Sequence, residues 1–423
     1  MPERSGRQRG IEIASGRNLR VAVAGCGAFG RNHLRVYREL EAANHDATEA
    51  GVELVAAVEP DAARAAETRD KYAIPVFESV DKLLAADLRL DAATVAVPTV
   101  HHHEVAAALL DAGLDLLVEK PLAANLAEAD DLIVRAEHGA RILQPGHLER
   151  FNPAVLAVEP QLKRPMFFES HRLSVYTPRA LDVDVVLDLM IHDLDIVLTF
   201  AASPVREVRA VGLPVVSPRV DIANVRVEFD SGCVANFTAS RVSTERVRKL
   251  RFFEPQQYVS IDYARQDLLV IRMDSDADSA PTAGKTSLLQ KALAAGLDLG
   301  KLTKLAAALP PDVVAAVTAG KMDAAIQARI AATGLIDPAV LAKFASGATG
   351  PAPGLSFAKP PVTPGEPLKL EIESFLDSVW TRKAPRVTAR QGRAALELAL
   401  EIQAAMAAHA ERAGLQDFFK PNS

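Results

Sequence analysis

A glycine-rich turn between a short apolar run and a helical segment constrains the fold of this chain more than any other feature. Leu19–Ala24 is a run of β-forming, mostly apolar residues, and Gly25, Gly27 and Gly30 follow it at the spacing GxGxxG. A helical pattern over residues 31–40 comes next. In a strand–turn–helix unit such glycines permit a tight turn, close approach of a pyrophosphate and close helix packing. The turn therefore predicts a βαβ unit that binds a dinucleotide at the helix N-terminus.

The alternation of apolar runs and helical segments continues to about residue 147. Residues 53–58, 92–97 and 114–118 are short and mostly apolar, and helical segments separate them. Strands of this kind belong to a parallel sheet that is buried on both faces. We therefore predict the α/β fold class, with a doubly wound parallel Rossmann sheet over residues 19–147.

Downstream of Phe151 the pattern is that of an α+β domain, predicted over 148–423. A helix predicted over 184–200 precedes runs rich in β-branched and aromatic residues, which predict a mostly antiparallel open sheet. These runs are 205–216, 222–229, 233–240, 247–253 and 258–273. The other predicted segments are a disordered tail (1–18), a helical insertion (274–364) and two last helices (367–381 and 389–413).

Composition excludes several classes of protein. The chain has 423 residues, of which 49% are hydrophobic and 24% charged, and its net charge of −6 gives no general attraction for nucleic acid. No stretch approaches the roughly 18–20 apolar residues that a membrane span requires. Cys26 and Cys233 are too few for a disulfide framework, so we predict a reducing, cytoplasmic location.

Glu59, at the end of the second predicted strand, bears on the choice of cofactor. It lies further from Gly30 than the usual spacing of about 20 residues, and a polar loop at 42–51 accounts for the excess. A carboxylate there accepts hydrogen bonds from the ribose hydroxyls and repels a 2′-phosphate, which favours NAD over NADP. A solvated Glu59 beside a helix cap at Asp61 is the alternative.

Two further segments carry groups suited to proton transfer. Glu119-Lys120 ends a predicted parallel strand, where ligands bind in such sheets. Asp188, His192 and Asp195 share one face of an otherwise apolar helix, so they are paired or functional. Hydride transfer needs no metal, and we predict none. The run 101–103 of three histidines does not suggest a metal site either, because adjacent side chains at a helix start point in different directions.

With these motifs in hand, the sequence resembles the glucose–fructose oxidoreductase / inositol dehydrogenase / MocA family. The resemblance rests on GxGxxG, Glu119-Lys120-Pro121 and Asp188-x3-His192-x2-Asp195, in that order. It implies an NAD(P)-dependent dehydrogenase acting on CH–OH groups, with Lys120, Asp188 and His192 as the catalytic trio. It also implies a homodimer or homotetramer. The predicted cofactor residues are Gly25, Gly27, Ala28, Phe29, Gly30, Glu59, Pro98, Thr99, His102, Glu119 and Lys120.

The segment from Gly146 to Pro153 resembles a narrower branch, the dehydrogenases that oxidise UDP-N-acetylglucosamine at its 3-hydroxyl for lipid A-type pathways. Arginine guanidinium groups bind diphosphates well. The predicted substrate residues are Arg150, Asn152, Arg172, Arg179, Asp195 and Arg241. A dehydrogenase of a free sugar or inositol-type polyol, and a non-catalytic NAD-sensing regulator, remain alternatives. Either His192, with an ordinary pKa of about 6.5, or a buried Lys120 can serve as the base.

Overall fold

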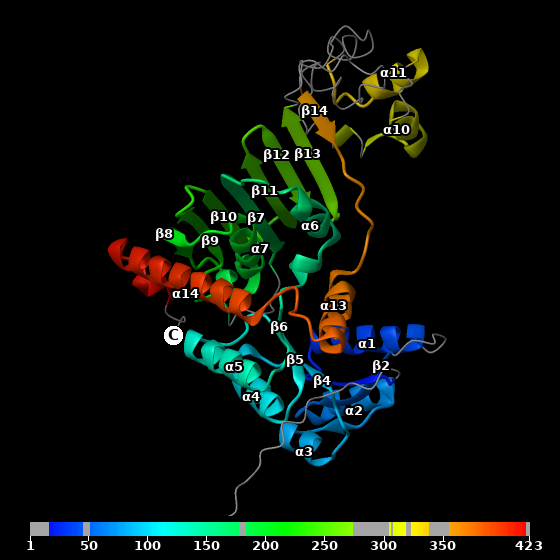
Figure 1. Ribbon diagram of the computed structural model, residues 1–423. Helices are drawn as coiled ribbons and strands as arrows, with labels where there is room; N and C mark the ends of the chain where they lie inside the picture. The colour runs from blue at the N-terminus through cyan, green and yellow to red at the C-terminus, as the bar shows by residue number, and fades with distance from the viewer. Residues whose placement is uncertain are drawn as a thin grey trace, which may run out of the picture. The chain divides into compact units, whose positions relative to one another are not determined.

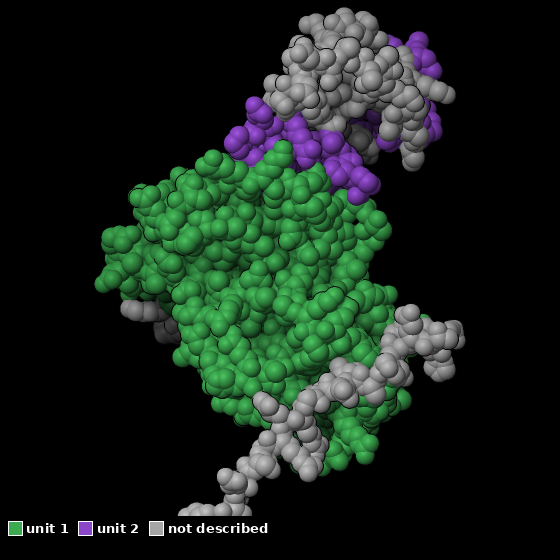
Figure 2. Space-filling view, viewed as in Figure 1, with its two compact units in different colours: residues 1–250, 262–266, 362–423 green, residues 251–261, 267–361 purple. Residues whose placement is uncertain are grey.

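The computed structural model describes residues 17–44, 51–176, 183–273, 304–305, 308–318, 323–337 and 355–419. The chain divides into two compact units, shown in two colours in Figure 2. The first unit takes in residues 1–250, 262–266 and 362–423, and the second takes in 251–261 and 267–361. None of the described helices is both long and apolar enough to cross a membrane.

The first sheet lies in the first unit and is wholly parallel, which confirms the predicted doubly wound α/β fold. Its strand order is β3-β2-β1-β4-β5-β6, so the order reverses direction next to β1, where ligands bind in sheets of this kind. Its strands are β1 (Leu19–Ala24), β2 (Val52–Val58), β3 (Val76–Phe77), β4 (Ala92–Val95), β5 (Asp115–Glu119) and β6 (Leu143–Gly146).

Helices cover both faces of this sheet, because side chains alternate along each strand. Val21 and Val23 of β1 join a core with α1 and α13, whereas Ala22 and Ala24 join a core with α4 and α5 on the other face. Asn125 caps α5 by accepting a hydrogen bond from the Glu128 backbone N–H. The helices here are α1 (Gly30–Asn44), α2 (Ala62–Tyr72), α3 (Val80–Ala85), α4 (His102–Asp111) and α5 (Leu126–His138), with the 3₁₀ turn η1 (Thr99–His101).

A second, mostly antiparallel sheet begins in the first unit, as predicted. There the order is β11-β7-β10-β9-β8, and β10 is antiparallel to β9 but parallel to β7. The sequence analysis missed β7, whose buried positions include the polar residues Ser170 and Arg172. Its strands are β7 (Phe167–Val175), β8 (Val205–Leu213), β9 (Ile222–Phe229), β10 (Val234–Ser243) and the start of β11 (Val247–Glu254).

Helices α7 and α14 pack together, and α14 also packs along β8, so both lie on one face of this sheet (Figure 1). The predicted helix over 184–200 contains a π-helical turn, η4 (Val186–Met190), before α7 begins. Helix α13 returns to the first sheet, where Ile372 and Phe375 are fully buried in its core. The remaining elements are η2 (Leu148–Phe151), α6 (Pro153–Val158), η3 (Glu159–Gln161), α7 (Ile191–Ala201), α13 (Pro367–Thr381), α14 (Ala389–Arg412) and η5 (Gln416–Phe419).

The second unit contains the strand order β14-β13-β12-β11. The single run predicted over 258–273 forms two strands, because a turn that includes Gln266 at φ +52° interrupts it. The predicted insertion contributes a strand as well as helices, and the helical segment expected at 338–344 lies outside the described residues. The elements are β12 (Gln257–Asp262), β13 (Asp267–Met273), α10 (Pro311–Thr318), α11 (Ala324–Ala331) and β14 (Leu355–Ala358).

Candidate active site

The glycine-rich turn has the geometry that a bound dinucleotide requires. Gly25 has φ +94°, and a Cβ there would lie 2.5 Å from the Ala96 carbonyl oxygen. A Cβ at Gly30 would lie 1.8 Å from the carbonyl oxygen of Gly25, so only glycine allows α1 to approach this closely. A Cβ at Gly27 would meet nothing within 4 Å. The backbone at Gly27 therefore faces open space at the start of α1, where a pyrophosphate fits.

Glu59 is only 4% exposed and is tied to this turn. Its carboxylate accepts hydrogen bonds from the Cys26 backbone N–H (3.0 Å) and the Arg64 guanidinium (2.9 Å). Burial by itself would raise the pKa of Glu59, but the hydrogen bonds from Arg64, Asp61 and Cys26 hold that pKa below its usual value. Arg64, in the first turn of α2, places a cation beside Glu59, which lies two residues before the helix cap Asp61.

A cleft of about 390 Å³ opens at the carboxyl ends of β4 and β5. It brings the ends of the nucleotide-binding strands together with η4, α7 and β7, which lie far away in the sequence. Predicted residues that line it are Phe29, Pro98, Thr99, His102, Glu119, Lys120, Arg172, Asp188 and His192. Lining residues that the sequence analysis did not propose are Ala96, Val97, Leu148, Glu149, Leu189 and Arg248.

Lys120 is held against the π-helical turn. Its Nζ donates to the Asp188 carbonyl oxygen (2.7 Å) and the Leu187 carbonyl oxygen (3.4 Å), and lies 3.8 Å from Asp188 Oδ1. Burial lowers the pKa of Lys120 below its ordinary 10.5, although the carboxylates of Asp188 and Glu119 oppose this shift. The amine can therefore exchange a proton more readily than a solvated lysine.

His192 lies two residues after Met190, the last residue of the π-helical turn, and lines the same cleft. Burial lowers the pKa of His192 well below 6.5, and the positive charges of Lys120 and Arg172 lower it further. The imidazole is consequently neutral at pH 7 and able to accept a proton. Its Nδ1 is buried and has no hydrogen-bond partner among the described residues.

His102, in the lining of the cleft, joins the segments that follow two strands. Its Nδ1 lies 2.8 Å from the Pro121 carbonyl oxygen, and its Nε2 lies 2.9 Å from the Val97 carbonyl oxygen. Burial lowers the pKa of His102, although these backbone contacts oppose the shift. The ring therefore fixes the segment after β4 to the segment after β5, on which Lys120 lies.

The predicted substrate arginines make internal ion pairs. Arg172 lines the cleft, but its guanidinium makes two hydrogen bonds with Asp193 (2.7 and 3.1 Å) and one with Glu149 (3.1 Å). Arg241 is 5% exposed and pairs with Asp221, 3.4 Å away. Both guanidinium groups thus carry structural pairs, and Arg179 lies outside the described residues.

Three other predicted substrate residues, Arg150, Asn152 and Asp195, are buried and do not line the cleft. Arg150 is buried beside Asp195, with 3.5 Å between the guanidinium and the carboxylate, and it also donates to Thr199. Asn152 caps α6 through the Ala154 backbone N–H and donates to the Tyr263 carbonyl oxygen (3.0 Å).

Arg248, on β11, is the lining arginine that the sequence analysis missed. Its Nε is buried without a hydrogen-bond partner in the described part of the chain. Burial and the neighbouring charge of Arg172 lower the pKa of Arg248. The only sequence signal was its place on a predicted strand, which does not identify the side chains that face the cleft.

Comparison with known proteins also indicates a nucleotide-binding domain followed by a second domain of an oxidoreductase family. Residues 19–147 match the family described as "Oxidoreductase family, NAD-binding Rossmann fold", and residues 155–254 match the "GFO/IDH/MocA C-terminal domain". The UDP-N-acetylglucosamine 3-dehydrogenase of Acidithiobacillus ferrooxidans is 35% identical over 252 residues, which cover 59% of this chain and 76% of that protein. An inositol 2-dehydrogenase of Acidothermus cellulolyticus is 30% identical over 211 residues, covering 47% and 58%.

Solved structures agree at the level of the fold. A structure of the Acidithiobacillus ferrooxidans UDP-N-acetylglucosamine 3-dehydrogenase superposes with a TM-score of 0.69 at 26% identity, covering 96% of this chain and 99% of that one. The myo-inositol 2-dehydrogenase of Lactobacillus plantarum superposes with a TM-score of 0.61 at 16% identity, covering 93% and 98%.

Proposed function

The chain belongs to the GFO/IDH/MocA family of nicotinamide-dependent oxidoreductases acting on CH–OH groups, and within it we propose an NAD-dependent oxidation of the 3-hydroxyl of UDP-N-acetylglucosamine to a ketone. The observation that carries the proposal is the meeting of Lys120 and His192 in one cleft beside the glycine-rich turn. The 35% identity to a UDP-N-acetylglucosamine 3-dehydrogenase supports this choice of sugar. A 3-keto product of this kind is what a transaminase needs to make a 3-amino sugar for a lipid A-type pathway.

In the proposed mechanism His192 removes the proton from the substrate hydroxyl. Its imidazole is neutral at pH 7, because burial lowers its pKa well below 6.5. Lys120 donates a hydrogen bond to the reacting oxygen and stabilises the negative charge that develops as the proton departs. Asp188 holds Lys120 in place with its carbonyl oxygen and has its carboxylate close to the amine. Bound NAD supplies the nicotinamide ring that accepts hydride from the same carbon.

We propose Arg248 as the residue that binds the diphosphate. Arg150, Arg172 and Arg241 are engaged in internal ion pairs, whereas Arg248, which lines the cleft as Arg172 does, has a buried Nε without a hydrogen-bond partner among the described residues. Its guanidinium Nε is free to donate to a phosphate oxygen, because no described protein group accepts from it. A charge-assisted hydrogen bond of this kind contributes about 1.5–3 kcal/mol.

The experiment that tests the function follows NADH formation by absorbance with a panel of alcohols. The panel contains UDP-N-acetylglucosamine, UDP-glucose, free N-acetylglucosamine and myo-inositol. We expect turnover of UDP-N-acetylglucosamine, and an Arg248→Ala enzyme should show a KM raised about tenfold or more for UDP-sugars. Arg241→Lys serves as the matched control, because Arg241 pairs internally with Asp221. Turnover of free sugars alone would overturn the proposal.

Oxidation of an inositol-type polyol is the second candidate. The 30% identity to an inositol 2-dehydrogenase favours it, and the same Lys120–His192 pair would serve. The two functions differ in their need for a diphosphate, so the panel separates them. In the inositol case Arg248→Ala should leave the KM for myo-inositol within about twofold of the parent, since an uncharged polyol offers no anion to a guanidinium group.

The proposed cofactor is NAD, and Glu59 is the residue that should select it. A carboxylate at the end of β2 accepts hydrogen bonds from the ribose hydroxyls and repels a 2′-phosphate. Glu59 is ionised, because its hydrogen bonds to Arg64, Asp61 and Cys26 hold its pKa below the usual value. Arg64 partly offsets the repulsion, which makes it the second residue that sets the preference.

We also propose a homodimer or homotetramer through the outward face of the second sheet. Helices α7 and α14 cover one face, and along β9 the residues of the opposite face, Asn224 and Arg226, are exposed. Half-buried Asn236 and Thr238 continue that face on β10. A two-fold contact of identical faces would bury the sheet symmetrically. Light scattering at micromolar concentration should give a dimer or larger, and a monomer would contradict the proposal.

A further inference from the structure

The π-helical turn η4 (Val186–Met190) is the part of the cleft that holds the Lys120 amine. Turns of this kind are rare and frequently occur at functional sites. The Lys120 Nζ donates to the carbonyl oxygens of Asp188 (2.7 Å) and Leu187 (3.4 Å), two successive residues of the turn. The Asp188 carboxylate, at 3.8 Å, is too far away for a third hydrogen bond. A lysine ammonium has three N–H donors, so the place of these two carbonyl groups decides where the third one points.

Asp184, two residues before the turn begins, binds the same two residues through their N–H groups. Its Oδ1 accepts from the Leu187 N–H (3.1 Å) and the Val186 N–H (2.9 Å), and its carbonyl oxygen accepts from the Asp188 N–H (3.1 Å). The first N–H groups of a helical segment have no partner within it, and an acidic side chain before the segment can supply one. Leu187 and Asp188 are therefore fixed on their N–H side by Asp184, and they offer their carbonyl groups to Lys120.

The Asp184 carboxylate is itself held by helix α14. Gln403 lies 219 residues further along the chain, and its side-chain amide donates to Asp184 Oδ2. Helix α14 also packs against η4. The residue before Asp184 is fixed as well, because the Val183 carbonyl oxygen accepts from the Arg241 guanidinium on β10. Two distant parts of the chain thus meet at Asp184 and hold the start of the turn in one place.

Asp184 and Gln403 lie outside the described lining of the cleft, so neither contacts the substrate directly. We propose that Asp184 is a positioning residue: it fixes η4 and, through the carbonyl groups of that turn, aims the Lys120 amine at the reacting oxygen of the substrate. The inference rests on the proposed function, in which Lys120 donates a hydrogen bond to that oxygen. Asp184 takes no proton from the substrate, and its effect is on the place of the amine alone.

An ordinary helix cap would contribute to stability and not to turnover. Ser79 gives the comparison within the same unit, because its side chain accepts from the Lys82 backbone N–H (3.3 Å) at the start of α3. Ser79 is not part of the described lining of the cleft. Ser79→Ala and Asp184→Ala therefore both remove a side-chain cap, but only the second loosens a turn that binds Lys120.

Steady-state kinetics of Asp184→Ala give the main test. We expect kcat to fall about tenfold or more, since a shift of about 1 Å in a reacting group can cost up to about 100-fold in rate. The KM for NAD should change by less than about twofold, a split that marks lost stabilisation of the transition state. Ser79→Ala should lower the denaturant midpoint of unfolding and keep the wild-type kcat. A folded Asp184→Ala enzyme with wild-type kcat would overturn the proposal.

Asp184→Asn is the conservative variant that should restore the function of the side chain. Its amide oxygen can accept from the Val186 and Leu187 N–H groups, and the Gln403 amide can rotate to accept from its NH₂ group. We expect a kcat within about threefold of the wild type, because the hydrogen bonds of the turn are kept. Gln403→Leu removes only the support of the carboxylate and should cost less than Asp184→Ala. An Asp184→Asn enzyme as slow as Asp184→Ala would contradict the proposal, since the acceptor oxygen would then have no part in the effect.

A double-mutant cycle shows whether the effect passes through Lys120. Lys120→Met keeps the length of the side chain and removes the amine, so the place of η4 should no longer matter to the rate. We expect Asp184→Ala to change the kcat of the Lys120→Met enzyme by less than about twofold, although it costs the wild type about tenfold. If the two losses multiply instead, Asp184 does not act through Lys120 and the proposal is wrong.

Hydrogen exchange reports on the turn without turnover. In a peptide that spans residues 185–188, mass spectrometry should show exchange about tenfold faster in Asp184→Ala than in the wild type, because the turn opens more readily. Unchanged exchange would overturn the role of Asp184. If the wild type oxidises no alcohol of the panel, the proposed function falls, and the aim of Lys120 at a substrate falls with it. Oxidation by the wild type together with an unaffected Asp184→Ala enzyme rejects the positioning role alone.

Discussion

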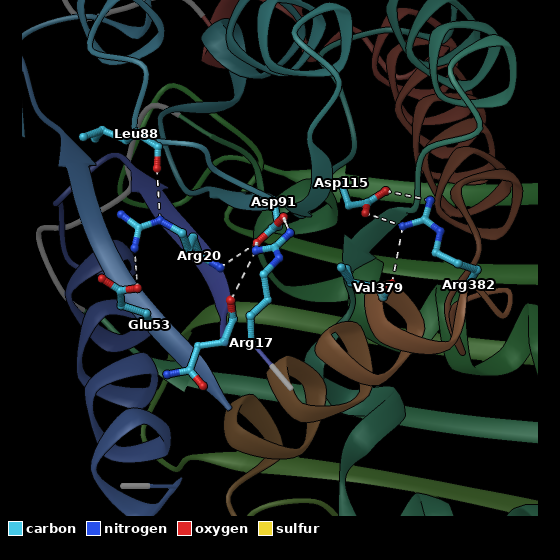
Figure 3. Close-up of polar contacts among 9 residues, drawn as sticks. Arg17, Arg20, Glu53, Leu88, Asp91, Asp115, Val379 and Arg382 are labelled. Atoms are coloured by element: carbon cyan, nitrogen blue, oxygen red, sulfur yellow. Dashed lines mark hydrogen bonds and ion pairs between the residues drawn. The ribbon is translucent and has the colours of Figure 1, made fainter. Parts of the chain in front are cut away.

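Charged side chains near the amino ends of the parallel strands (the amino edge) and near their carboxyl ends (the carboxyl edge) differ in how fully they are paired. At the amino edge the charged side chains drawn in Figure 3 are paired with one another. Arg17 makes two hydrogen bonds with Asp91 (2.7 and 2.6 Å), and Arg20 pairs with Glu53. Asp115, at the first position of β5, is buried and accepts from Arg382, which lies just after α13. These pairs fix strand starts to each other and to the C-terminal part of the chain.

At the carboxyl edge the charges are gathered without full pairing. Lys120 lies 3.8 Å from the Asp188 carboxylate and donates to backbone carbonyl groups instead. His192 and Arg248 carry buried nitrogens that lack hydrogen-bond partners among the described residues. Paired charges stabilise a fold, whereas unpaired ones keep shifted pKa values and remain available to a ligand. The difference assigns stability to one edge and chemistry to the other.

The largest effect should come from His192→Ala at the carboxyl edge. We expect turnover to fall roughly 10²–10⁴-fold, the range for loss of a general base. The free energy of unfolding and the affinity for NAD should stay near those of the parent, because no described group hydrogen-bonds to His192 Nδ1. Steady-state kinetics and calorimetric titration with NAD measure the two quantities. Near-parental turnover with an unaltered pH profile would transfer the role of base to Lys120.

The pH profile of turnover separates the two candidate bases by the sign of each limb. With His192 as base, activity is lost at the acid end as pH falls through the lowered pKa of His192, well below 6.5. It is lost again as pH rises through the pKa of Lys120, which burial places below 10.5, because the amine must stay charged to donate. With Lys120 as base, activity would instead rise through that alkaline pKa.

Arg382→Ala tests the amino edge. It leaves Asp115 buried, with only the Ile142 backbone N–H (2.7 Å) as a remaining partner within the described contacts of its carboxylate. We expect a loss of about 2 kcal/mol in the free energy of unfolding, because removing one partner leaves an uncompensated charge. Denaturant titration measures the loss. Turnover per folded molecule should not change, and a drop in turnover at full folding would break the separation of the two edges.

Glu59 sharpens the comparison, because it lies at the carboxyl edge but is paired as the amino-edge charges are. Glu59→Ser should weaken NAD binding and reduce the ratio of NAD affinity to NADP affinity by about tenfold. Both the contacts with the ribose and the repulsion of the 2′-phosphate are lost in this variant. Arg64→Ala is the matched variant and should raise the ratio of NAD affinity to NADP affinity, since it removes the cation that pairs with the Glu59 carboxylate. Equal use of NAD and NADP by the parent protein would contradict this prediction.

The smallest effect is expected from Arg17→Ala. Its side chain is 44% exposed, so its ion pair with Asp91 is largely screened by water. Ion pairs of this kind contribute about 0–1 kcal/mol. The temperature of thermal unfolding should therefore fall by less in Arg17→Ala than in Arg382→Ala. A loss equal to that of Arg382→Ala would mean that exposure does not decide the strength of pairing at this edge.

Most elements of the fold could be predicted from local pattern. The bounds of α13 (Pro367–Thr381) are those predicted, because its apolar periodicity depends on neighbouring residues. The strand β7 (Phe167–Val175) was missed, and its buried positions include the polar residues Ser170 and Arg172. The π-helical turn at 186–190 was also missed, and Lys120 donates to the carbonyl oxygens of Leu187 and Asp188 within it.

By itself the sequence determined the glycine-rich turn, the places of Lys120 and His192 in their elements, and the class of fold. Each depends on residues a few positions apart, for which spacing alone is decisive. Only the tertiary structure showed that Arg248 also lines the cleft and that the predicted Arg172 is held there in internal ion pairs. Arg150 pairs with Asp195 across 45 residues and Arg382 with Asp115 across 267, and spacing does not record such partners. Those distant partners decide whether a charged side chain is paired within the protein or remains available to bind a ligand.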